Sequence, residues 1–179
     1  MRVFIDEIEP TEMATYLEAC YIETFGVQLD QGLQHMHNHS ISELIALWKT
    51  CDRFHHESLM RVTKKTIEKT ILRMGEKMSQ YSQYRNFSGF EDAVKSFVGG
   101  FQALNAHSEI GGMDESGNKA LTTFLAEVFC VSCGARRWRE VAWALPLEFA
   151  VEASIWWCKE ILCLEKDIIE RESVKRRLP

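Results

Sequence analysis

The clearest structural pattern in this chain is the stretch Ile67-Glu68-Lys69-Thr70-Ile71-Leu72-Arg73-Met74-Gly75-Glu76-Lys77-Met78. Its large apolar residues recur in steps of four, three and four, which places them in one stripe along a helix: Ile67, Ile71, Met74 and Met78. Inside a helix, a glycine such as Gly75 costs about 1 kcal/mol relative to alanine. The stretch therefore predicts an amphipathic helix with a close neighbour at Gly75 and an acid, Glu76, beside it.

The composition favours a single all-α domain that spans residues 1–179. The chain is long enough to bury a sizeable core, and 46% of its residues are hydrophobic and 26% charged. It has only three prolines, and the alternating runs of Val, Ile and Thr that would indicate strands are scarce. The net charge of -5 argues against nucleic acid as a partner, because proteins that bind it normally present a basic surface.

Helical periodicity and cap signals predict six to seven helices, at residues 11–26, 41–54, 58–84, 88–100, 120–133, 137–157 and 157–174. Capping boxes are expected where Ser40 precedes Glu43 and where Ser88 precedes Glu91. Residues 137–157 are apolar around nearly the whole circumference, so we expect this helix at the centre of a bundle. Gly134 is expected to end the preceding helix, and Pro146 to kink or divide the central one.

The six cysteines are expected to be reduced. No signal-peptide pattern precedes them, which indicates a cytoplasmic chain. Cys130 and Cys133 have the spacing of a redox or zinc pair, but the partner pair that zinc needs is missing, and we interpret them as core residues. No run reaches the roughly 18 uncharged apolar residues of a membrane span. We therefore expect no integral membrane anchor.

A second pattern lies between two predicted helices and reads Cys133-Gly134-Ala135-Arg136-Arg137-Trp138-Arg139-Glu140-Val141-Ala142. Together with residues 67–78, and in the same order, it resembles the Bcl-2 family of apoptosis regulators over about residues 60–157. Residues 67–78 are similar to the third homology motif of that family. Residues 134–142 are similar to the first, roughly Gly-x-Asn-Trp-Gly-Arg-x-Val-Ala, with Gly134 on its first glycine and Arg139 on its arginine.

This resemblance implies a Bcl-2-like bundle around a central hydrophobic helix, with no enzymatic activity, cofactor or metal. The implied function is pro-survival: a surface groove sequesters the amphipathic death-motif helix of pro-apoptotic Bcl-2 proteins, and Arg139 pairs with the aspartate of that helix. The third motif comprises Ile67, Ile71, Met74, Gly75, Glu76 and Met78. The residues expected to contact a partner are Arg139, Trp138, Met74, Met78, Tyr81, Phe97, Phe101, Leu125, Phe129 and Val141.

The sequence departs from the family in three places. A gapless alignment puts Trp138 where the family has glycine, which would crowd the groove and narrow the range of ligands. The second homology motif is missing, and so is a hydrophobic C-terminal anchor. Small, anchorless and divergent members of the family are often viral decoys, so a viral and a cellular origin both stay open. The resemblance implies a cytoplasmic protein, or one held at the mitochondrial outer membrane by its partners, in the host cell if the chain is viral. A crowded groove would also fit a homodimer, formed if the third-motif helix swings out to bind another copy.

Two hypotheses from other classes stay open. One is a helical-bundle enzyme or metal carrier that uses Glu148, Glu152 and the histidines at positions 35, 37, 39, 55 and 56. It lacks the Glu-x-x-His partners that carboxylate-bridged metal sites use. The other is a helical adaptor of unrelated ancestry, whose partner binding would not depend on Arg139.

Overall fold

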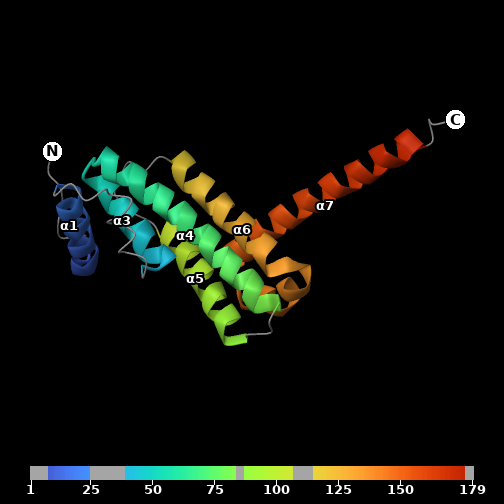
Figure 1. Ribbon diagram of the computed structural model, residues 1–179, viewed down its shortest axis with the longest axis horizontal. Helices are drawn as coiled ribbons and strands as arrows, with labels where there is room; N and C mark the ends of the chain where they lie inside the picture. The colour runs from blue at the N-terminus through green and yellow to red at the C-terminus, as the bar shows by residue number, and fades with distance from the viewer. Residues whose placement is uncertain (1–7, 25–38, 84–86, 107–114, 176–179) are drawn as a thin grey trace.

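The computed structural model describes residues 8–24, 39–83, 87–106 and 115–175 (Figure 1). Within them the α-helices are α1 (Pro10–Thr24), α3 (Ile41–Arg53), α4 (Glu57–Gln83), α5 (Phe87–Asn105), α6 (Glu115–Val141) and α7 (Leu147–Lys175), and a 3-10 helix, η2, covers Ala142–Ala144. These residues contain no strand. The prediction of an all-helical bundle is confirmed.

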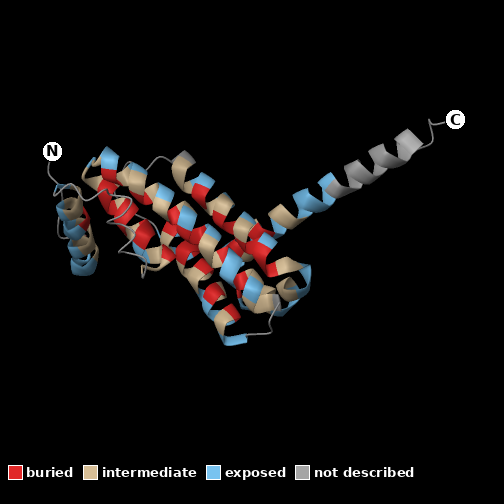
Figure 2. Ribbon diagram, in the orientation of Figure 1, coloured by how far each residue is buried: buried red, intermediate tan, exposed pale blue. Residues whose placement is uncertain are grey.

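Helix α4 lies at the centre of the packing, against α3, α5 and α6. Its predicted stripe faces this contact, since Ile67, Ile71 and Met78 are fully buried and Met74 is partly buried. Figure 2 shows the buried residues gathered where these four helices meet. The apolar stripe of residues 67–78 is thus part of the core that α4 shares with α3, α5 and α6, whereas α1 packs against a separate cluster around Leu59.

Gly75 is the point of closest approach between α4 and α6. A Cβ atom on this residue would stand 2.6 Å from both Ser132 Oγ and Val128 Cγ1. One turn further along α4, the hydroxyl of Ser79 donates to the carbonyl of Ser132 over 3.3 Å. The close neighbour predicted from the glycine is therefore confirmed, and it is α6.

The first predicted capping box is confirmed and the second is wrong. Ser40 Oγ accepts from the Glu43 backbone N–H at 3.2 Å, and Glu43 Oε2 accepts from the Ser40 backbone N–H at 2.7 Å. The hydrogen bond from the Ser40 backbone N–H is the main cause that lowers the pKa of the Glu43 carboxyl, and a second one from the Ser40 hydroxyl, at 3.0 Å, adds to it. Helix α5, in contrast, begins at Phe87, so Ser88 lies inside its first turn rather than at the cap.

The predicted division of residues 137–157 at Pro146 is confirmed, whereas the prediction that a separate helix begins at residue 157 is wrong. Gly134 has φ 68° and ψ 155°, a conformation that kinks α6 as expected and that favours glycine. Helix α6 then continues to Val141. Leu145 is extended, with φ -79° and ψ 149°, because a residue before proline avoids the helical region. Helix α7 starts after Pro146 and runs without a break past Trp157.

The expected central position of this segment is also wrong. The first part of α7 joins the core through Phe149 and Ala153, which are fully buried, and through Trp156 and Trp157, which are partly buried against it. The remainder of α7 projects away from the other helices as a single rod (Figure 1). Pro146 changes the direction of the chain, and α7 is longer than the part of the helical bundle against which it packs. None of the helices in the described part of the chain is long and apolar enough to cross a membrane.

We predict that Gly75→Ala destabilises the fold although alanine is the better helix former. The added methyl group overlaps Val128 and Ser132, and overpacking of this kind costs about 1–3 kcal/mol. The matched control is Gly99→Ala, where the nearest atom to a new Cβ is 3.8 Å away. Urea unfolding should show a lower midpoint for Gly75→Ala and an equal or higher one for Gly99→Ala. Equal midpoints for the two variants would contradict the close contact.

Candidate functional site

The segment that follows the kink in α6 forms most of an open cavity, which we call the junction cavity. Its volume is about 890 Å³. The end of α4 and the start of α5 complete it, and it is lined by Ser82, Phe87, Cys133, Gly134, Ala135, Arg136, Arg137 and Glu140. Residues 134–137 and 140, which belong to the segment that resembles the first homology motif, thus border a concavity on the surface.

The three arginines of this segment have different environments. The guanidinium of Arg137 lies 4.9 Å from the ring centroid of Phe87 and 5.4 Å from that of Phe90, and it pairs with Glu140. Arg137 therefore joins α5 to α6. Arg136 and Arg139 are exposed, and neither has an ion-pair partner among the described residues. These two guanidinium groups are available to an acidic ligand.

Trp138 packs toward the core rather than into solvent. Its ring meets Phe129 edge-on, with 6.4 Å between centroids, and Trp138 and Val141 are both partly buried against the core. This contact fixes the direction in which the segment leaves the kink. Arg136 and Arg139, on either side of Trp138, lie on the outside as a result.

The residues predicted to wall a groove lie together, but inside the bundle. Met78, Phe97, Phe101, Leu125 and Phe129 are at most 4% exposed, and Met74 and Tyr81 are partly buried. Sequence reasoning missed Phe149 of α7, which stacks on Phe101 at 4.7 Å and meets Phe129 at 5.0 Å. These side chains hold the helices together, and contact between them and a partner stays a prediction.

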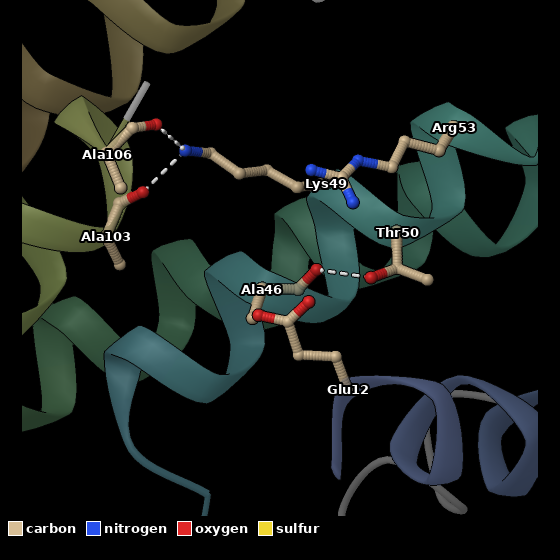
Figure 3. A pocket seen from close by; sticks show the side chains of 7 residues that line it. All are labelled: Glu12, Ala46, Lys49, Thr50, Arg53, Ala103 and Ala106. Carbon is tan, nitrogen blue, oxygen red and sulfur yellow. Dashed lines mark hydrogen bonds between the residues drawn. The ribbon is translucent and has the colours of Figure 1, made fainter. Parts of the chain in front are cut away.

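A smaller cavity of about 170 Å³ lies between α1, α3 and α5. Figure 3 shows Lys49 reaching across it toward the end of α5. The Lys49 ammonium donates to three carbonyl oxygens there, those of Ala103 at 2.6 Å, Ala106 at 3.1 Å and Leu104 at 3.2 Å. Burial lowers the pKa of Lys49. With every proton of the ammonium directed at a carbonyl, Lys49 caps the C-terminus of α5 and is not a free amine.

A polar cluster joins α1 to the start of α4. His56 Nε2 lies 2.8 Å from a Glu23 oxygen, while its Nδ1 lies 3.3 Å from the Tyr16 hydroxyl and 3.7 Å from Cys20 Sγ. Ser58 also donates to Glu23, and burial raises the pKa of Tyr16. The Cys20 thiol and the Tyr16 hydroxyl both face the same nitrogen of His56, and Glu23 faces the other nitrogen. We therefore interpret the cluster as a set of polar contacts that holds α1 against the start of α4. In the sequence, the spacing of four and then three residues between Tyr16, Cys20 and Glu23 indicates that they share one side of a helix.

The residues of the metal hypothesis do not converge. Glu148 is exposed and Glu152 is partly buried on α7, and His39 pairs with Glu43 at 3.4 Å. His35 and His37 lie outside the described residues. Over residues 8–24, 39–83, 87–106 and 115–175, no three or more His, Cys, Asp or Glu side chains form a group that could hold a metal ion.

Helix α7 carries an exposed apolar surface, which we call the α7 face and define as Leu147, Val151, Ser154, Ile155, Cys158 and Leu162. All of these side chains are exposed, and together with Ala150 and Lys159 they line one shallow hollow. Apolar side chains gathered in this way on a surface mark interaction sites. The prediction of a central helix over residues 137–157 placed Leu147, Val151, Ser154 and Ile155 inside the bundle, which the structure contradicts.

Comparisons of this chain with protein-family models, with curated proteins and with solved structures found no match.

We predict that Lys49→Met lowers the free energy of unfolding by about 2 kcal/mol, because hydrogen bonds to a charged group are lost at a helix end. Lys65→Met is the control, since Lys65 is exposed on α4. Chemical denaturation followed by circular dichroism measures both. If both variants lost the same stability, Lys49 would have no capping role.

We predict that Cys130 and Cys133 resist alkylation in the native protein. Burial raises the pKa of each thiol to about 12, so at pH 8 only about one thiol in ten thousand is the reactive thiolate. Exposed Cys163 is the internal control. Pulsed iodoacetamide labelling and peptide mass spectrometry should modify Cys163 first. Labelling of all three at one rate would show that the bundle opens at α6.

Proposed function

We propose that this chain is a non-enzymatic, Bcl-2-like regulator of apoptosis that binds the amphipathic death-motif helix of pro-apoptotic proteins and so favours survival. The observation that carries the proposal is the pair of exposed guanidinium groups on the segment after Gly134: Arg136, which lines the junction cavity, and Arg139, one turn further along the segment. Both belong to the segment that resembles the first homology motif. The all-helical bundle and the buried stripe of α4 support the same interpretation.

The junction cavity offers what an amphipathic helix with an acidic residue needs. A guanidinium forms two parallel hydrogen bonds with a carboxylate, which fixes the register of the bound helix. Phe87, 60% exposed at the rim, supplies an apolar surface for a large side chain of the ligand. Gly134 has nothing within 4 Å of where a Cβ would be, so a ligand backbone can come close there.

The apolar contacts are expected to provide most of the affinity, and the arginines most of the specificity. Burying a large apolar side chain contributes about 1.5–3 kcal/mol, whereas an exposed ion pair contributes about 0.2–1 kcal/mol. A carboxylate that is shielded by the bound helix would gain more. The site of action follows from the partners: the cytoplasm, or the mitochondrial outer membrane where pro-apoptotic proteins would hold the chain.

We predict that at least one death-motif peptide binds with sub-micromolar affinity and that Arg139→Ala weakens it about tenfold, the loss expected for a partly shielded charge pair. Fluorescence anisotropy with a panel of labelled peptides measures this. Arg61→Ala is the control, because Arg61 is an exposed arginine about 30 Å along α4 from Ser82.

Binding that is insensitive to Arg139→Ala would favour the unrelated helical adaptor. No binding by any peptide would overturn the proposal. Both variants replace one exposed arginine with alanine and so change the net charge equally. A difference between their peptide affinities therefore reflects the position of the arginine.

A further inference from the structure

The α7 face occupies one side of its helix and leaves the opposite side to the core. With about 100° between successive residues, its side chains fall within about 100° of arc centred near Val151. Phe149 and Ala153, which are buried, point the other way. Leu147 and Leu162 at its two ends are 75% and 57% exposed. The face is therefore a continuous apolar strip of about four turns that nothing in the described structure covers.

One flank of this strip carries unpaired charges of opposite sign. Viewed down the helix axis, the charged side chains of this flank all lie on the same side of the strip, at about 60° (Glu148), 100° (Glu152) and 80° (Lys159) from Val151. None of them has an ion-pair partner in the described parts of the chain. Glu148 and Lys159 are about 16 Å apart along the axis, too far to pair within one helix. The other flank, with Ala150 and Ile161, is uncharged.

We propose that a second copy of this chain covers the α7 face, with the two α7 helices antiparallel about a twofold axis. This symmetry brings each charged flank against the same flank of the other copy. If the axis passes between Ser154 and Ile155, the middle of the strip, Lys159 of the partner subunit lies level with residue 150. It is then about 3 Å along the axis from both Glu148 and Glu152. In a parallel pair, Lys159 would face the uncharged flank.

The apolar contacts also match in this register. Leu147 lies opposite Leu162 of the partner subunit, Val151 opposite Cys158 of the partner subunit, and the small Ser154 opposite Ile155 of the partner subunit. Burying Ser154 leaves no unsatisfied donor, because its hydroxyl already donates to the Ala150 carbonyl at 2.7 Å. In η2, shortly before α7, Trp143 is a further exposed aromatic side chain, at 84%.

The length of the strip limits the affinity that we expect for the dimer. Residues 147–162 span about 24 Å of helix, so the contact is at or below the low end of the range of stable interfaces, about 1,200 Å². We expect a dimer that dissociates at micromolar concentration. Neither Arg139 nor the junction cavity takes part, so this inference is independent of the proposed function.

The first test is sedimentation equilibrium from about 1 to about 100 µM, a range that brackets micromolar affinity. Wild type should pass from monomer to dimer. Lys159→Glu alone, and Glu148→Lys with Glu152→Lys, should each raise the dissociation constant about tenfold because like charges then face one another. An equimolar mixture of these two variants should restore dimerisation, since opposite charges meet again between unlike copies.

The control for net charge is Lys119→Glu, an exposed residue of α6, which should leave the dimer intact. A wild type that stays monomeric at 100 µM would overturn the proposal. So would a dimer that is weakened by Lys159→Glu but is not restored by mixing.

A second test reads the register directly. Val151→Cys should form an interchain disulfide with Cys158 of the partner subunit under mild oxidation, because facing positions of two packed helices suit disulfide geometry. Non-reducing electrophoresis and peptide mapping identify the link. Adding Cys158→Ser should abolish it, and Glu160→Cys, on the opposite side of the helix, should not form it. Equal cross-linking by Val151→Cys and Glu160→Cys would overturn the antiparallel arrangement.

Discussion

The close contact of α4 with α6 at Gly75 is the constraint on which the rest of the structure depends. A side chain at this position would stand 2.6 Å from Ser132 and Val128, so the two helices approach as far as a glycine allows. The hydrogen bond from Ser79 to Ser132 holds them there. Ile71 and Met78, on either side of Gly75, then complete a core that α3 and α5 share with them.

This contact also determines where the chain leaves the core. It fixes the part of α6 that immediately precedes Gly134, and the left-handed φ of that glycine turns the following segment. The contact of Trp138 with Phe129 returns one side chain of the segment to the core and leaves Arg136 and Arg139 outside. After Pro146, α7 contributes Phe149 and Ala153 and then projects beyond the bundle.

Two surfaces with different chemistry result. The junction cavity is cationic and open, and it suits an acidic amphipathic helix. The α7 face is apolar and carries a flank whose charges, Glu148 and Glu152 against Lys159, complement those of a second copy. In both proposals the ligand is a helix, and the two surfaces lie on different segments, so the proposed binding of a partner and the proposed self-association are compatible within one molecule.

The sequence alone determined that the chain is helical and where most of the helices before Gly134 lie, because periodicity and caps are local signals. The stripe from Ile67 to Met78, the cap at Ser40 and the kink at Gly134 all follow from spacing and from the φ preference of glycine. Tertiary structure decided which apolar faces are covered. The apolar circumference of residues 137–157 does not reveal whether the chain's own core or another molecule covers it, because that depends on the direction of the helix after Pro146. Likewise, Lys49 caps α5 and His56 meets Cys20 only because folding brings together groups that are distant in the chain.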